Sequence, residues 1–238
     1  MLKNLDSLGE QTINRIATAA LASQMKEAES FSVKVKVDPQ ELSQGVVSSF
    51  AMAGKNVVTS EGFRASHLSL LIEQISVHPF KALMGNIQLR QPAVGNALLE
   101  VSPADLEDAL QRKLRAMVQG SLIVENLSCD FIAPNMLQVR GVAVDRQNLE
   151  ELLNLAVNFT VSYNVGAKAI AFERVERIDS DEKLNIFYVE LQNILLDLLN
   201  LNSLMFTGLE FSVKSIRLVN GNFALMAIAK ITSFPKAA

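Results

Sequence analysis

The residue types that most often carry out chemistry are few in this chain and do not cluster. It contains two histidines, His67 and His78, and one cysteine, Cys129. Each histidine stands in a strand-like segment without nearby acidic or thiol groups, which favours an ordinary histidine over a metal ligand or an acid–base catalyst. Residues 127–131 lack a nucleophile-elbow pattern, so Cys129 is interpreted as a small packing residue rather than a reactive thiol. A single cysteine also excludes an intramolecular disulfide.

The acidic groups of the sequence are explained by predicted helix starts. Glu107 and Asp108 lie in the first turn of one predicted helix, and Asp179, Asp181 and Glu182 lie at the start of another. Carboxylates in these positions cap backbone N–H groups and interact favourably with the helix dipole. The sequence has no glycine-rich phosphate loop. We therefore predict no catalytic residues, no metal site and no cofactor.

The helices and strands that would position a functional site come from a chain rich in apolar residues. The 238 residues are 49% hydrophobic and include 12 Phe but no Trp. A chain of this length buries about 70% or more of the surface that its unfolded form exposes. The formal net charge of −3 and the 6% of aromatic residues do not provide the basic surface and stacking platforms of a nucleic-acid-binding protein. Nucleic acid is therefore excluded as a predicted partner.

Hydrophobic periodicity predicts alternating helices and strands in the first half. Apolar spacing predicts a helix over residues 7–29 and a half-buried strand over residues 31–37. Several strands follow between residues 45 and 89. A strand beginning at Ala93 leads into Ser102-Pro103-Ala104-Asp105, a capping-box-like helix start with proline in the first helical position.

The second half repeats this order and ends in a hairpin. Strands are predicted over residues 122–144, and the clearest alternation covers residues 157–165. A helix is predicted over residues 182–199. Asn220-Gly221, a favoured turn between antiparallel strands, predicts a hairpin over residues 209–231. The order suggests a single domain over residues 1–238 with two similar halves, about 1–120 and 121–238, but no residue-level repeat proves a duplication.

The second strand of this hairpin is unusual because residues 223–229 are apolar on both faces. An antiparallel strand with one solvated face should alternate between apolar and polar residues, so both faces are expected to be covered. One interpretation is a strand packed between two protein layers. The other is that one face meets a helix while part of the interior is left for a ligand.

Two parts of the chain resemble a known family. The run from Ala93-Val94-Gly95-Asn96 through Ser102-Pro103-Ala104-Asp105 to Ala109-Leu110 resembles the LmeA-like phospholipid-binding family of bacteria. The C-terminal residues Asn193-Ile194-Leu195, Leu209-Glu210-Phe211-Ser212-Val213 and Ser233-Phe234-Pro235 resemble its cyanobacterial branch. The resemblance implies an α+β fold like that of tubular lipid-binding proteins, with highly curved antiparallel sheets wrapped around long amphipathic helices.

The resemblance also implies a function, namely non-catalytic binding or transfer of phospholipid or another acyl-chain lipid in an apolar groove. The alternative is a structural or assembly protein with a filled core and no ligand. The candidate lipid-binding residues are apolar side chains on the predicted strands: Leu68, Leu70, Phe159, Val161, Phe211, Val213, Phe223, Leu225 and Ala227.

Any membrane contact is expected to be peripheral. Arg112, Lys113 and Arg115 lie close together on the second predicted helix and would suit anionic head groups, although a solvated helix face is the commoner explanation. Residues 1–10 lack the pattern of an export signal, and the longest charge-free run, residues 152–167, is too short and too polar to span a membrane. These features predict a cytoplasmic protein whose contact with a membrane, where it occurs, is peripheral, and they leave the oligomeric state open.

Overall fold

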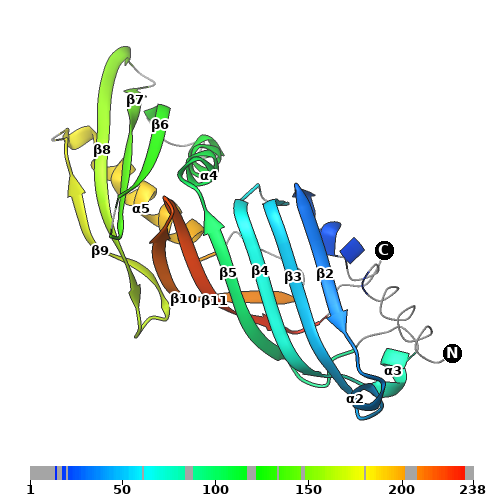
Figure 1. Ribbon diagram of the computed structural model, residues 1–238. Coiled ribbons are helices and arrows are strands. Elements are labelled where there is room, and N and C mark those ends of the chain that lie inside the picture. The colour runs from blue at the N-terminus through cyan, green and yellow to red at the C-terminus, as the bar shows by residue number, and fades with distance from the viewer. Residues whose placement is uncertain are drawn as a thin grey trace. The chain divides into compact units, whose positions relative to one another are not determined.

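The computed structural model describes residues 14, 18–19, 21–60, 62–83, 88–116, 122–132, 134–145, 148–179, 181–201 and 208–233 (Figure 1). These residues form mostly antiparallel β-sheet with a few helices. The elements are β1 (Met25–Glu27), β2 (Ser30–Lys36), α2 (Pro39–Ser43), β3 (Val46–Thr59), β4 (Arg64–Ser76), α3 (Pro79–Leu83), β5 (Ala93–Val101), α4 (Pro103–Ala116), β6 (Leu122–Ile132), β7 (Met136–Asp145), β8 (Asn148–Asn164), β9 (Ala169–Arg177), the 3-10 helix η1 (Glu182–Leu184), α5 (Asn185–Leu199), β10 (Leu209–Val219) and β11 (Asn222–Ile231).

The strands form two open, curved sheets. A seven-stranded sheet has the order β1-β3-β4-β5-β11-β10, with β2 also paired to β3, and a four-stranded sheet has the order β6-β7-β8-β9. This confirms the predicted α+β class with curved antiparallel sheet. The longest helices of the described residues are α4, with 14 residues, and α5, with 15.

The chain divides into two compact units. Unit 1 comprises residues 1–99, 204–212 and 226–238, and unit 2 comprises residues 100–203 and 213–225. Each unit therefore combines segments that are distant in sequence, and the β10–β11 hairpin contributes residues to both. The similarity of two sequence halves stays a prediction.

Unit 1 has one buried sheet face that follows the predicted alternation. Val33 of β2 pairs with Met52 of β3, which pairs with Leu70 of β4. These three side chains are 4, 2 and 3% exposed, whereas Lys34 and Lys36 on the other face of β2 are exposed. The prediction of a half-buried strand over residues 31–37 is confirmed.

The helix predicted over residues 7–29 ends earlier than expected. Residues 21 and 22 are helical, but Met25–Glu27 form β1, in which Met25 pairs with Thr59 of β3. Residues 7–13 lie outside the described part of the chain. Pairing with β3 satisfies backbone groups of residues 25–27, and this non-local contact overrides the local helix propensity.

Unit 2 begins with the predicted capping box. The Ser102 hydroxyl accepts a hydrogen bond from the Asp105 N–H at 3.1 Å and donates one to the Asp105 carboxylate at 2.6 Å. The Asp105 carboxylate also accepts a hydrogen bond from the Ser102 N–H at 3.3 Å, so the two residues together satisfy two backbone N–H groups at the start of α4. Leu106 and Leu110 then lie on the buried side of α4, both 0% exposed. The helix start predicted from sequence is confirmed.

The remaining strongly predicted elements of unit 2 are also confirmed. Val157, Phe159 and Val161 of β8 are at most 1% exposed, while the intervening Asn158 and Thr160 are more exposed. The predicted helix over residues 182–199 is present as η1 followed by α5. The hairpin turn has Asn220 at φ 51° and Gly221 at φ 78°, the left-handed conformations that Asn-Gly turns favour.

Candidate functional site

Eight of the nine candidate lipid-binding residues are already covered by protein. In unit 1, Leu68, Leu70 and Ala227 are buried, and Phe211 is half-buried. The buried candidates in unit 2 are Phe159, Val161, Val213, Phe223 and Leu225. The candidates therefore divide between the two units, and in the described conformation the eight buried ones are core residues.

The apolar face of the four-stranded sheet is centred on β8. Phe159 pairs with Leu137 of β7 and with Val175 of β9, and its ring centroid lies 4.6 Å from that of Phe172. Phe159 and Leu137 are 0% exposed, whereas Val175 is 39% exposed. On this face, the exposure of apolar side chains rises along the edge strand β9, from 3% at Ile170 to 39% at Val175.

The strand that was expected to be covered on both faces is covered over only part of its length. Phe223, Ala224 and Leu225 are 1, 7 and 0% exposed, and the Phe223 ring centroid lies 3.8 Å from that of Phe131 in β6. Met226, however, is 47% exposed. The expectation is wrong at Met226, because an apolar side chain identifies a residue that can be buried but not one that a second layer reaches.

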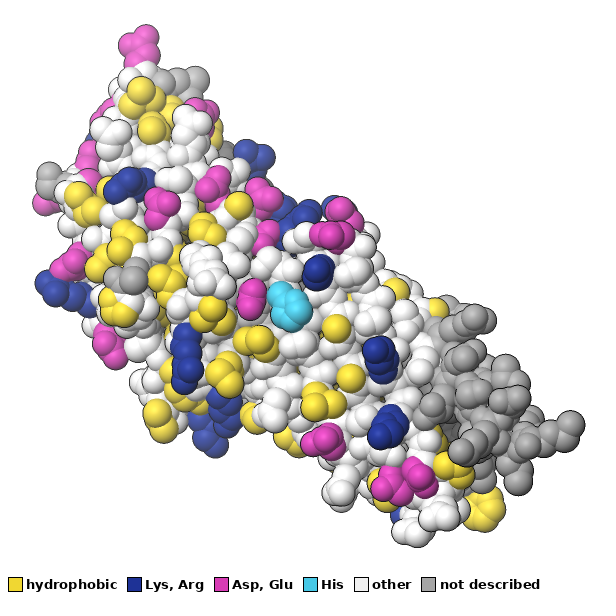
Figure 2. Space-filling model, in the orientation of Figure 1, with side chains coloured by type: hydrophobic (Ala, Val, Ile, Leu, Met, Phe, Trp, Pro, Cys, Tyr) yellow, Lys and Arg dark blue, Asp and Glu magenta, His cyan; other side chains and the backbone are white. Residues whose placement is uncertain are grey.

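Other large hydrophobic side chains of unit 2 are exposed. On the visible face in Figure 2, hydrophobic side chains lie interspersed with Lys, Arg, Asp and Glu. The most exposed in unit 2 are Leu152, Val165, Ile178, Ile186 and Val189. Ile186 and Val189 are three residues apart on α5, which places them on one side of that helix.

One member of the basic group on α4 contacts the neighbouring helix. Lys113 forms an ion pair with Asp197 of α5, with Nζ and Oδ2 3.3 Å apart, and Arg112 and Arg115 are exposed. No helix in the described part of the chain is long and apolar enough to cross a membrane.

The residues with catalytic potential are dispersed. His67 is half-buried on β4, opposite Lys55, and His78 is exposed. Cys129 is buried, and this burial, with smaller effects of the charges of Glu107 and Asp130, raises its pKa to about 12. Its thiol therefore stays protonated at neutral pH, which agrees with a packing role. No group of three or more His, Cys, Asp or Glu that could hold a metal ion occurs within the described ranges.

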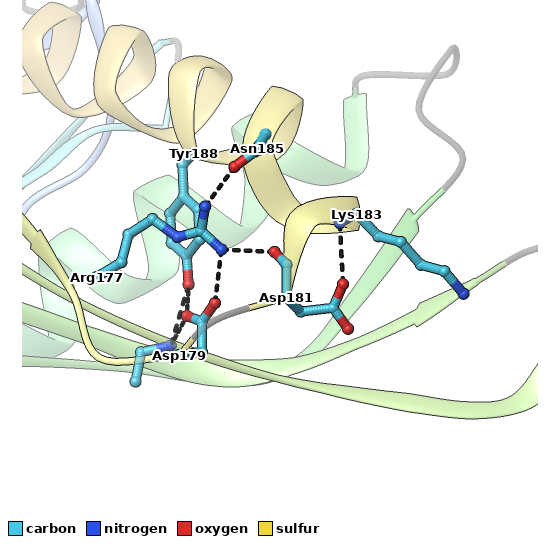
Figure 3. A network of polar contacts seen from close by, with 7 residues as sticks. Arg177, Asp179, Asp181, Lys183, Asn185 and Tyr188 are labelled. Atoms are coloured by element: carbon cyan, nitrogen blue, oxygen red, sulfur yellow. Dashed lines mark hydrogen bonds and ion pairs between the residues drawn. The ribbon is translucent and has the colours of Figure 1, made fainter.

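A polar cluster that sequence reasoning missed connects the sheet of unit 2 to the start of α5 (Figure 3). Arg177, at the end of β9, donates hydrogen bonds to the Asp179 carboxylate at 2.9 Å and to the Asp181 carbonyl at 2.5 Å. It also donates to the Asn185 side chain, and its guanidinium lies 4.6 Å from the centroid of the Tyr188 ring. The cluster comprises Arg177, Asp179, Asp181, Lys183, Asn185 and Tyr188.

Asp179 is the central acceptor of this polar cluster. Its carboxylate accepts hydrogen bonds from the Tyr188 hydroxyl, from Arg177 and from the Ala156 N–H of β8, the last at 3.3 Å. The expectation that Asp179 serves as a helix-capping group is therefore wrong. Asp181 fills that role, because its side chain accepts a hydrogen bond from the Lys183 N–H at 2.9 Å.

The protonation of the polar cluster follows from these contacts. Burial of the Asp179 carboxylate favours its neutral form, but hydrogen bonds from Tyr188, Arg177 and Ala156 outweigh burial and hold its pKa below the usual value. Burial and the hydrogen bond to Asp179 raise the pKa of Tyr188. The carboxylate is therefore ionised and the phenol neutral at pH 7. Both are held in one arrangement that joins α5 to β8.

Comparison with known proteins gives one result. The family model described as LmeA-like phospholipid-binding matches residues 5–223, nearly the whole chain. No curated protein and no solved structure matches the chain.

Proposed function

Because this chain belongs to the LmeA-like phospholipid-binding family, we propose that it binds phospholipid or another acyl-chain lipid and does not catalyse a reaction. The observation that carries this proposal is the match of the family model over residues 5–223. An apolar groove, transfer of lipid between membranes and peripheral contact with a membrane surface are parts of the same proposal. So is the tubular lipid-binding arrangement that the sequence resemblance implies.

Burial of methylene groups supplies the affinity in this proposal. Each buried methylene contributes about 0.8 kcal/mol, so eight of them contribute roughly 6 kcal/mol. The sheet faces around Phe159 in unit 2 and Leu70 in unit 1 consist of aliphatic and phenyl groups that suit acyl chains. Recognition of this kind depends on chain length and shape more than on hydrogen bonds.

A second candidate function is a structural or assembly protein with a filled core. It is favoured by one observation, the burial of eight of the nine candidate residues in the described conformation. Under the lipid-binding proposal, an acyl chain must displace protein side chains from these faces. Under the alternative, no lipid enters.

Lipid carriage distinguishes the two functions. We expect the protein purified gently from a bacterial host to carry phospholipid or fatty acid in less than one-to-one ratio, detectable by native mass spectrometry and organic extraction. After delipidation it should take up a fluorescent phospholipid, and a free fatty acid should compete while glycerol phosphate, which has no acyl chain, should not. The absence of both extractable lipid and uptake would favour the filled core.

Membrane contact is tested on α4. We expect the triple change of Arg112, Lys113 and Arg115 to glutamate to weaken flotation of the protein with vesicles that contain anionic lipid, because each basic residue near such a surface contributes about 1 kcal/mol. The matched control is the same charge reversal at Lys168, Lys214 and Arg217, three other exposed basic residues of unit 2. Equal flotation of both triple variants would exclude a specific role for α4.

A further inference from the structure

The apolar face of unit 2 can receive a ligand only if an element that covers it moves. Phe159 and Val161 of β8 are 0 and 1% exposed, so an acyl chain has no access to them in the described conformation. Helix α5 packs against the sheet along β9, the edge strand whose Val175 is already 39% exposed. Phe223 of β11 covers the same face on the β6 side, where its ring centroid lies 3.8 Å from that of Phe131, so the position and attachment of α5 decide access on the β9 side.

Helix α5 runs antiparallel to β9 along its whole length. Asn185, at the start of α5, contacts Arg177 at the end of β9, and Asn200, just after α5, contacts Ile170 near the start of β9. A helix of 15 residues is about 22 Å long. The strand between Ile170 and Arg177 spans about 23 Å. The two elements match in length, so contacts at both ends hold α5 against the edge of the sheet.

At its C-terminal end, α5 is attached to β9 by Asn200. The side-chain amide of this residue forms the two hydrogen bonds that the backbone of a neighbouring strand would form. The Asn200 side-chain oxygen accepts a hydrogen bond from the Ile170 N–H at 2.6 Å, and its NH₂ group donates to the Ile170 carbonyl at 3.1 Å. The same NH₂ group donates to the Leu196 carbonyl at 2.9 Å, which links the last turn of the helix to the edge strand. The backbone groups of Ile170 thereby obtain the partners that an edge strand lacks.

The attachment at the N-terminal end is the polar cluster around Arg177, Asp179 and Tyr188. The Tyr188 hydroxyl lies within hydrogen-bond distance of the Ala156 N–H, at 3.3 Å, and it donates to Asp179. Between the two attachments, α5 buries apolar side chains such as Leu191 and Leu195. Among the described residues, the backbone of α5 forms no hydrogen bond to the sheet.

We propose that α5 is a strap that opens from the four-stranded sheet without unfolding the sheet, and that an acyl chain enters unit 2 beneath it. This inference rests on the proposed lipid binding. It follows from the attachment of α5 to the sheet by side chains at two ends and by non-directional apolar packing between them, while the ion pair between Lys113 and Asp197 joins α5 to α4 and not to the sheet. Such an element can detach at a smaller free-energy cost than β7 or β8, because these two strands are paired along both edges.

Hydrogen exchange of the full chain, followed by mass spectrometry of peptides, tests opening without any lipid. We expect peptides of α5 to exchange faster than those of β7 and β8 in the wild type. In Asn200→Ala, exchange in α5 should accelerate about tenfold, the change that corresponds to the loss of ~1.4 kcal/mol of hydrogen bonding, with β7 and β8 unchanged. Asn193→Ala, an exposed position on the same helix, is the control. Simultaneous exchange of α5 and β8 in every variant would overturn the strap.

Uptake of labelled phosphatidylcholine from phosphatidylcholine vesicles tests entry. We expect Asn200→Ala, and Asn185→Ala at the other end of α5, to take up the lipid several-fold faster than Asn193→Ala, with the same final amount per folded molecule. Faster opening of α5 with an unchanged uptake rate would overturn entry beneath α5. If α5 opens but no variant takes up labelled phosphatidylcholine, entry of an acyl chain beneath α5 would be overturned as well. That result would also count against the proposed lipid binding.

Discussion

Replacement of Gly95 by alanine is expected to lower the free energy of unfolding of unit 1 by about 3 kcal/mol, the upper end of typical overpacking costs. A Cβ atom at Gly95 would lie 2.5 Å from Cγ1 and 2.8 Å from Cα of Ile72 in β4, and closer still to the Leu71 carbonyl oxygen. The backbone of β4 cannot yield easily, because Leu71 and Ile72 also pair with β3. The close approach of β5 to β4 therefore requires glycine.

Denaturant unfolding followed by circular dichroism measures the loss at Gly95, and hydrogen exchange in β3 and β4 assigns it to unit 1. Gly141→Ala in β7 is the matched control, because a Cβ atom there meets its nearest neighbours at 3.4 Å, an ordinary contact. That variant should unfold at the wild-type denaturant concentration or slightly above it, since alanine restricts the unfolded chain. Equal stability of the Gly95 and Gly141 variants would contradict the close approach of β5 to β4.

The second large effect is expected for Asp179→Asn, which should destabilise unit 2 by about 2–3 kcal/mol at pH 7. The carboxylate faces Arg177, Tyr188 and the Ala156 N–H, and its side chain is only 12% exposed. An amide in its place supplies less negative charge to Arg177 and points an N–H group at one of these donors. The exposed Glu182→Gln, in the adjacent helical turn, should change stability by less than about 0.5 kcal/mol.

The pH dependence of unfolding separates the charge of Asp179 from its packing. Its pKa is lower in the folded protein than the ordinary 3.8, so the folded state binds the proton less tightly than the unfolded state. The stabilisation is complete above about pH 5 and decreases as the pH falls through the folded-state pKa. Urea unfolding between pH 7 and pH 3 should show a smaller acid-induced loss in Asp179→Asn than in the wild type. Parallel losses in both proteins would exclude a stabilising carboxylate.

Local signals in the sequence were sufficient for several elements. Ser102 and Asp105 are three residues apart, and the capping box that they form needs no distant residue. The Asn220-Gly221 turn and the alternation along β8 are local in the same sense. Where backbone conformation and side-chain period carry the information, the sequence predicts the element and its buried face.

Distant contacts explain what the sequence left undecided about the site. Lys113 belongs to a basic group in the sequence, but its partner Asp197 is 84 residues away. In the sequence Asp179 resembles a helix cap, but in the structure it accepts a hydrogen bond from Ala156 of β8, 23 residues earlier. Asn200 has no sequence signature at all, and its role depends on Ile170, 30 residues away. Contacts between such distant residues depend on the order of the strands in the sheet, and hydrophobic periodicity does not predict that order.

The sequence by itself determined the α+β class, the faces of the strands that turn inward, and the resemblance to a phospholipid-binding family. Only the tertiary structure decided what covers those faces. Removing an apolar side chain from water is favourable whether a helix, a strand or an acyl chain covers it. The alternation along β8 therefore could not predict which of these covers its apolar face. The attachment of α5 to β9 through Arg177 and Asn200 could be identified only in the tertiary structure, which places the two elements side by side.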